Sequence, residues 1–114
     1  MKSVLFTLTI FLAIAAKKCN KSKENLPACV QERIEEIKKQ PPWNPRAEVY
    51  EYEYNGSRVY YISSDCCDNY NTVIDNNCNY LCSPSGGITG KGDGKCPDFQ
   101  SSAKMIRLIW KDER

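Results

Sequence analysis

Residues 48–63, EVYEYEYNGSRVYYIS, decide the fold of this chain. Asn55-Gly56 lies between two runs rich in Tyr, Val and Ile, and it suits a two-residue type I′ turn, in which both residues need positive φ. Such a turn predicts an antiparallel hairpin in which the numbers of paired residues add to 111. Glu53 then lies opposite Arg58, so that opposite charges face each other. The other face of the hairpin carries Tyr50, Tyr52, Tyr54 and Tyr61.

A helix is expected before this hairpin, in residues 26–40, LPACVQERIEEIKKQ. Pro27 suits the first helical position, where its missing N–H would be unpaired in any case, and Pro41-Pro42 ends the helix. Apolar side chains recur at helical spacing, which predicts one buried stripe: Leu26, Val30, Ile34 and Ile37. Cys29 borders the stripe, and Trp43 is expected to cap the core. We expect this helix to cover the tyrosine face of the hairpin and to leave Tyr60 and Tyr70 exposed.

Two further strand regions complete the expected sheet. Residues 72–82 predict a second hairpin around Asn76-Asn77, with paired numbers adding to 153. Residues 105–110, MIRLIW, predict a final strand with Ile106, Leu108 and Trp110 on one face. The fold class is therefore α+β, with an N-terminal helix packed on a small antiparallel meander of four or five strands, stabilised by disulfides.

The N-terminus resembles an export signal. Met1-Lys2 is followed by the apolar run 4–14 and by Ala13-Ile14-Ala15, a small-x-small cleavage pattern. We interpret residues 1–15 as a signal peptide, 16–25 as a flexible polar leader and 26–114 as a single cysteine-rich domain. The apolar run is shorter than a bilayer requires, so the mature protein is expected to be periplasmic or secreted and to have no transmembrane span. Lipid attachment at Cys19 is the lesser alternative, because Lys18 stands where a small residue normally precedes the modified cysteine.

Composition narrows the possible chemistry. The 114 residues contain no histidine, which excludes Ser-His-Asp and Cys-His catalysis as well as histidine-ligated metals. Residues 26–114 carry 11 basic and 13 acidic side chains, a net charge of −2, so the domain lacks the basic face that nucleic-acid binding needs. We expect no enzyme, no cofactor and no nucleic-acid partner.

Seven cysteines are an odd set, so at least one sulfur is left outside any three intrachain disulfides. The candidates for pairing are Cys29, Cys66, Cys67, Cys78, Cys82 and Cys96, with Cys19 as the odd thiol. We prefer Cys82 with Cys96, because the bond closes a loop of about 15 residues and stabilises it by about 3 kcal/mol. Adjacent cysteines of an extended chain point to opposite sides, so Cys66 and Cys67 are expected to pair separately, one with Cys29 and one with Cys78.

Other cysteine chemistry ranks lower. A four-thiolate zinc site formed by Cys66, Cys67, Cys78 and Cys82 lacks the CxxC spacing of structural zinc sites. A redox centre formed by the Cys66-Cys67 pair is the least favoured of these alternatives.

Five of the six glycines lie within residues 86–94, in the stretch CSPSGGITGKGDGKC at 82–96. Neither the P-loop pattern nor the calcium-loop pattern fits the sequence around this stretch. The stretch is either a surface loop whose glycines serve turns, or a recognition loop that presents Lys91, Asp93 and Lys95. The candidate recognition residues are Gly86, Gly87, Gly90, Lys91, Gly92, Asp93, Gly94 and Lys95.

Taken together, these segments resemble a family of small exported, cysteine-rich bacterial proteins classed as a domain of unknown function. The segments are LPACVQERIEEIKKQ, VYEYEYNGSRVYYI, the CCD at 66–68, CSPSGGITGKGDGKCPDF at 82–99 and the closing IWKDER. The resemblance implies a cell-envelope or secreted location, and it implies no activity and no functional residues.

Three functions follow as hypotheses. The first is a small binding or inhibitory module that offers the tethered loop to a protein or cell-envelope partner, since a pre-ordered loop loses less entropy on binding. The second is a structural envelope component without a discrete ligand. The third and least favoured is a carboxylate-dependent hydrolase, for which this chain is short of a substrate cleft.

Overall fold

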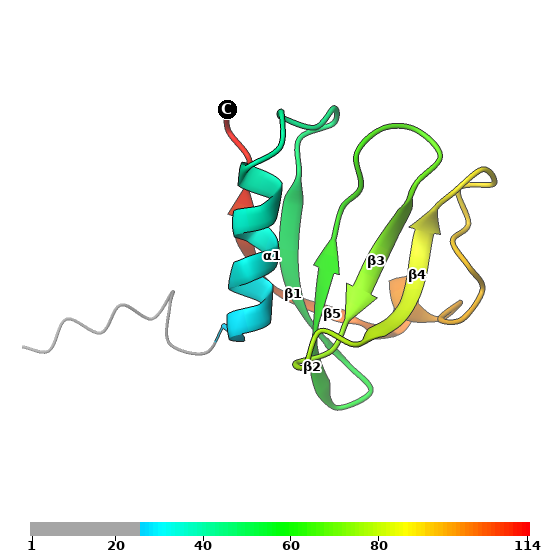
Figure 1. The fold of residues 1–114 in the computed structure, drawn as a ribbon. Helices are drawn as coiled ribbons and strands as arrows, with labels where there is room; N and C mark the ends of the chain where they lie inside the picture. Colours follow the sequence, from blue (N-terminus) through cyan, green and yellow to red (C-terminus); the bar gives the residue numbers. More distant parts are fainter. Residues whose placement is uncertain (1–25) are drawn as a thin grey trace, which may run out of the picture.

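The computed structural model describes residues 26–114, in which one helix packs on a five-stranded antiparallel sheet. Figure 1 shows helix α1, Ala28–Lys38, against one face of the sheet, with its axis roughly along the strands. The strands are β1 (Glu48–Tyr54), β2 (Ser57–Ile62), β3 (Tyr70–Ile74), β4 (Tyr80–Gly86) and β5 (Lys104–Lys111), and a short helix α2, Phe99–Ser102, precedes β5. Their order in the sheet is β4-β3-β2-β1-β5, which is a meander whose last strand returns beside the first. The expected α+β class is confirmed.

The β1–β2 hairpin has the predicted register. Tyr54 pairs with Ser57, Glu53 with Arg58, and the remaining pairs follow the same sum to Val49 with Ile62. Asn55 has φ 51° and Gly56 has φ 76°, the positive values that the type I′ turn requires. Local turn chemistry and the two-residue side-chain period therefore suffice to set this part of the fold.

The β3–β4 hairpin exists, but its predicted register is wrong. Ile74 pairs with Tyr80 and Val73 with Cys82, so the sums are 154 and 155 instead of 153. The Asp75 side chain accepts hydrogen bonds from the backbone N–H groups of Asn77 and Asn79, and these bonds hold a turn longer than two residues. The register then shifts again within β4, which moves the pairing further from the simple hairpin.

Strand β5 is present where it was predicted, but its expected alternation is wrong. Register shifts between Val49 and Tyr50 and between Glu51 and Tyr52 interrupt its pairing with β1. The side chain of Trp110 consequently packs with the helix-side core, whereas Ile106 and Leu108 are exposed. A β-bulge places neighbouring residues out of step with the period of two on which the alternation depends.

Helix α1 buries the stripe that its sequence predicts. Val30, Ile34 and Ile37 are buried and join Val49 and Ile62 of the sheet in one cluster. Trp43 packs against the edge of the same cluster, as expected.

The expected assignment of the two sheet faces is wrong. The helix covers the face of the sheet that bears Tyr60, which is buried, and its hydroxyl donates to Asn76. The tyrosine face lies on the opposite side, where Tyr52, Tyr54 and Tyr61 pack against Phe99. Alternation reports which side chains share a face, and both faces of this hairpin are rich in large side chains. Tyr70 is exposed, as predicted.

Two buried carboxylates, Glu51 and Asp112, are paired with arginines. Glu51 of β1 accepts from Arg58 at 2.7 Å and from Arg107 at 2.6 Å, and these bonds lower the pKa of Glu51 although burial opposes this shift. Asp112 pairs with Arg114, whose guanidinium donates to the carbonyl oxygens of Lys38 and Gln40 at the end of α1. The second contact satisfies helix carbonyls that would otherwise lack partners.

The expected signal peptide, the leader and Cys19 lie outside the described residues. Within residues 26–114, no helix is both long and apolar enough to span a membrane.

Candidate recognition surface

Three disulfides join the six cysteines of residues 26–114. Cys82 pairs with Cys96, which confirms the predicted tether of the glycine-rich loop. The other two predicted pairings, Cys29 with Cys66 or Cys67 and the remaining one with Cys78, are wrong. The structure instead joins Cys29 to Cys78 and Cys66 to Cys67. Disulfides suggest an oxidising, extracellular type of environment for the folded domain.

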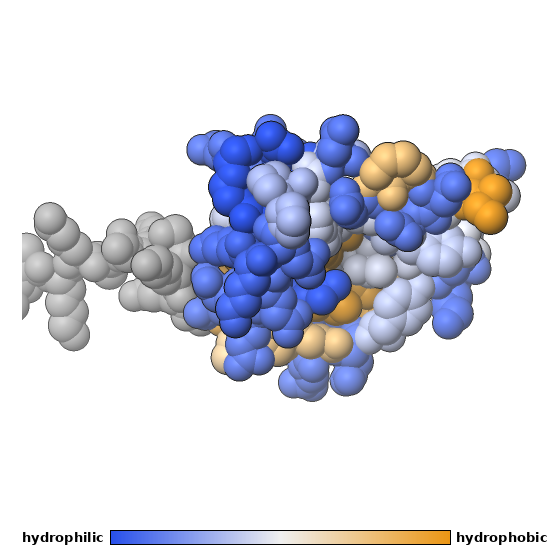
Figure 2. Space-filling view, turned by 45° about the horizontal axis from the view of Figure 1, so that its top comes forward, coloured by the Kyte–Doolittle hydropathy of each residue, from blue (hydrophilic) through white to orange (hydrophobic). Residues whose placement is uncertain are grey.

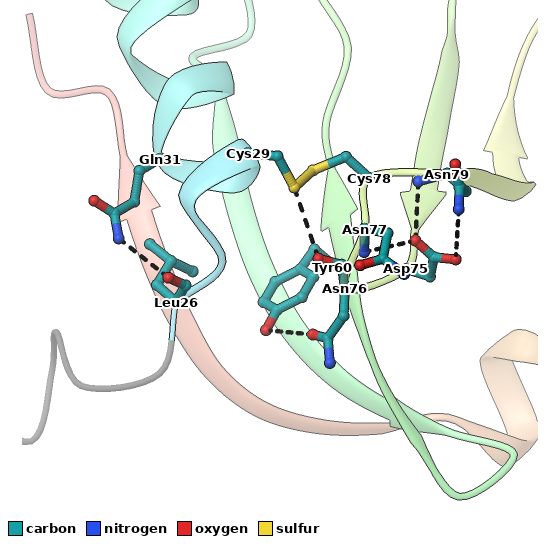
Figure 3. Close-up of a disulfide and its surroundings, with 9 residues drawn as sticks. All are labelled: Leu26, Cys29, Gln31, Tyr60, Asp75, Asn76, Asn77, Cys78 and Asn79. Atoms are coloured by element: carbon teal, nitrogen blue, oxygen red, sulfur yellow. Dashed lines mark hydrogen bonds between the residues drawn. A yellow bond between two sulfur atoms is a disulfide. The ribbon is translucent and has the colours of Figure 1, made fainter.

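The Cys29–Cys78 disulfide fastens helix α1 to the turn between β3 and β4 (Figure 3). Cys78 has φ 60°, which turns its side chain towards the helix, and the Asp75 carboxylate holds the same turn in place. The Cys29 sulfur lies 3.7 Å from the carbonyl oxygen of Asn76. This geometry could not be read from strand alternation, because it depends on a turn residue with positive φ.

Cys66 and Cys67 pair with each other because the chain is not extended at this place. Cys67 has φ 105°, so the alternation of side chains assumed for an extended segment does not apply. Both residues lie in the exposed connection between β2 and β3.

The glycine-rich loop is folded onto the end of strands β3 and β4 by its own backbone. The Asp93 N–H donates to the Ser83 carbonyl at 2.9 Å, and the Gly92 N–H donates to the Gly86 carbonyl at 3.1 Å. Gly92 has φ 76°, and a side chain there would run into the Ser83 carbonyl oxygen. Glycine at this position therefore provides both the backbone conformation and the close approach.

Asp93 and Lys95, two of the expected recognition residues, make contacts inside the loop. The Asp93 carboxylate accepts from the Tyr80 hydroxyl and, at 3.0 Å, from the Lys95 N–H. The hydrogen bond from Tyr80 lowers the pKa of Asp93, and burial together with this bond raises the pKa of Tyr80. The Lys95 ammonium lies 5.3 Å from the centre of the Tyr80 ring. These contacts hold the base of the loop against β4.

The tip of the loop faces solvent. Ile88 is 90% exposed, and Thr89, Gly90 and Lys91 beside it are also exposed. Figure 2 shows hydrophobic surface at this end of the molecule, beyond the polar outer side of α1. The sequence interpretation missed Ile88, although it is the one aliphatic side chain between Gly86 and Lys95.

The connection between β2 and β3 packs beside the loop. The Gly87 N–H donates to the Asn69 carbonyl at 3.1 Å, and the Tyr70 ring lies over Gly87, where it would contact any side chain at that position. Tyr70 is itself 49% exposed. The loop tip, residues 87–91, thus forms one surface with Asn69 of this connection and with Tyr70 at the start of β3. We call this surface the loop end of the sheet.

A depression lies beside α1. It has a volume of about 330 Å³ and is lined by Ile62 and Ile74 from the sheet and by Glu32 and Glu36 from the helix. Hydrophobic surface between the helix and the sheet is visible in Figure 2. Within residues 26–114, no group of three or more His, Cys, Asp or Glu side chains is placed to hold a metal ion.

Fold and surface together define a small α+β domain whose loops are tied by disulfides. The chain belongs to the family described as a domain of unknown function, DUF6970, whose model matches residues 35–112. The match begins within α1 and includes all five strands and the glycine-rich loop. No curated protein matches this chain. No solved structure matches it either.

Proposed function

We propose that this protein is an exported binding or inhibitory module that presents the loop end of the sheet, led by Ile88, to a protein or cell-envelope partner. The observation that carries the proposal is a 90% exposed isoleucine at the tip of a loop that is fixed at its base. Exposed aliphatic side chains are unremarkable when the chain around them is mobile or when they are scattered over a surface. Here the backbone bonds of Gly92 and Asp93 and the Cys82–Cys96 disulfide hold the tip in one arrangement.

Pre-ordering determines how much of the contact energy remains for binding. A loop that is already ordered loses little conformational entropy when a partner covers it. Full burial of one isoleucine side chain contributes about 1.5–3 kcal/mol, which corresponds to roughly a 10- to 150-fold change in affinity. Ile88 is therefore expected to be the anchor of the contact, with Lys91 beside it at the rim.

Export supports the same proposal. The disulfides fit an oxidising compartment, and the Met1–Ala15 segment has the pattern of a signal peptide. Site-specific capture in cells that make the protein tests the binding function. The full chain with a photo-crosslinking amino acid at position 88 is compared with the same label at position 105, since Met105 is 60% exposed on the far edge strand β5.

The expected result is a discrete crosslinked species from position 88 that position 105 does not give. Ile88→Ser should reduce co-purification of that species by about tenfold or more, whereas Met105→Ser leaves it unchanged. If neither labelled position gives a discrete crosslinked species, or if Ile88→Ser and Met105→Ser behave alike, the loop is not a recognition element. The second hypothesis, a structural component without a discrete ligand, would then be the better account.

A further inference from the structure

The Cys66–Cys67 disulfide cannot hold the fold together in the way that the other two do. A disulfide stabilises mainly by closing a loop of unfolded chain, and the gain rises with the length of that loop. Cys82–Cys96 spans 14 positions and Cys29–Cys78 spans 49, whereas Cys66 and Cys67 are neighbours in the chain. No folded segment is enclosed by the neighbouring pair, so its role is better sought in sulfur chemistry than in stability.

The pair is also the most accessible of the three disulfides. Cys66 and Cys67 are both exposed, whereas Cys82 and Cys96 are 2% and 5% exposed and Cys29 and Cys78 are partly buried. Exchange requires a thiolate to reach one sulfur of the disulfide, so access to solvent favours attack at this pair.

Polar bonds from Asp65 and Asn69 also hold the loop around the pair. The Asp65 carboxylate accepts from the N–H groups of Asn44 and Cys66, each at 3.0 Å. The Asn69 side chain donates to the carbonyl oxygens of Asp65 at 3.0 Å and of Cys66 at 3.2 Å. The backbone would therefore keep its course after reduction, and the two released thiols would stay next to each other.

We propose that Cys66–Cys67 is a reversible thiol-exchange site for low-molecular-weight thiols. The thiolate of the small molecule attacks one sulfur and forms a mixed disulfide, while the other sulfur leaves as a thiolate. A second molecule of the small thiol attacks the mixed disulfide, which leaves a dithiol on the protein and the small thiol as its own disulfide. The reverse reaction uses that small disulfide as the oxidant, and the neighbouring thiol closes the pair within one molecule.

The local charge selects among small thiols. Asp65 and Asp68 immediately flank the pair, and the loop 64–69 contains no basic residue. Two nearby negative charges repel an anionic thiol and favour a cationic or neutral one. Both carboxylates are exposed, so the preference is expected to be about two- to fivefold and to weaken at high salt.

Differential alkylation of the full oxidised protein tests the proposal. The protein is incubated with increasing cysteamine, quenched in acid and alkylated, then fully reduced and labelled with a second, isotopically distinct alkylating reagent. Tandem mass spectrometry then assigns the first label to each cysteine. We expect Cys66 and Cys67 to open at least about tenfold faster than Cys82 and Cys96.

Two controls separate this chemistry from general reduction. The double variant Cys66→Ser/Cys67→Ser should lose the fast phase and keep the far-ultraviolet circular dichroism of the wild type. The Asp68→Asn variant should narrow the difference between cysteamine and anionic 2-mercaptoethanesulfonate, because it removes one of the two negative charges beside the pair. The Asp68 side chain makes no hydrogen bond or ion pair within residues 26–114, so the variant should leave the fold unchanged. Equal opening rates for all three disulfides would overturn the proposal. It is equally overturned if Cys66 and Cys67 are alkylated before any thiol is added, or if either is found joined to Cys19.

Discussion

Removal of the Cys29–Cys78 disulfide is the perturbation from which we expect the largest loss of stability. The double variant Cys29→Ser/Cys78→Ser releases a crosslink over 49 positions, and the chain-entropy relation gives about 4 kcal/mol for a closed loop of that length. A domain with the 89 described residues has a total stability of about 4–13 kcal/mol. The loss is therefore a large fraction of the whole, and among the described residues α1 loses its only disulfide link to the sheet side of the domain.

Urea unfolding under non-reducing conditions measures this loss. Trp43 and Trp110 both pack against the cluster beneath α1, so their fluorescence reports the docking of the helix. With an ordinary urea dependence for a small domain, a loss of about 4 kcal/mol moves the midpoint down by about 2 M. The matched control is Cys66→Ser/Cys67→Ser, which removes the same number of sulfurs but no long loop and should cost under about 1 kcal/mol.

Similar losses of stability in the two double variants would contradict this prediction. A loss of less than about 1 kcal/mol in Cys29→Ser/Cys78→Ser would contradict it as well. In either case, packing of the apolar stripe would hold α1 in place, and the stabilisation by these disulfides would not depend on the length of the loop that each one closes.

A further prediction concerns the C-terminal ion pair. The side-chain hydrogen bond from Arg114 lowers the pKa of Asp112 to about 2, so its stabilising contribution is complete above the ordinary pKa of 3.8 and is lost as the pH falls through about 2. In acid titrations, Asp112→Asn should therefore be less stable than the wild type at neutral pH and should approach it near pH 2, whereas exposed Glu113→Gln should follow the wild type throughout.

The sequence predicted those parts of the fold that depend on contacts between near neighbours. The register of β1 and β2 follows from Asn55-Gly56 and from alternation, and the stripe of α1 follows from helical spacing. The predicted register of β3 and β4 was wrong because the Asp75 side chain holds a longer turn. The prediction of which sheet face the helix covers failed for a different reason. Alternation shows which side chains share a face, and long-range packing determines which of the two faces the helix covers.

The disulfide tether of the candidate loop was predicted correctly, and Lys91 is exposed at its tip, but the contacts of Asp93 and Lys95 inside the loop were not predicted. Charged side chains in a glycine-rich loop suggest recognition, yet Asp93 is held by Tyr80 and Lys95, and Lys95 lies over the Tyr80 ring. These partners come from β4 and could not be inferred from the spacing within the loop. The exposed Ile88 could have been found, because an aliphatic residue among glycines has no neighbouring apolar residue that would predict a buried stripe.

The disulfides differ in which parts of the domain they join. Cys82–Cys96 and Cys66–Cys67 are closed within residues 66–96, beside strands β3 and β4, and both lie wholly inside the family match at residues 35–112. Cys29–Cys78 instead reaches outside that match to the first turn of α1. The Gly87 bond to Asn69 and the Asp93 bond to Ser83 involve no residue of the helix. The loop end of the sheet is consequently positioned by β3 and β4, and a change that loosens α1 need not alter the surface that the partner would contact.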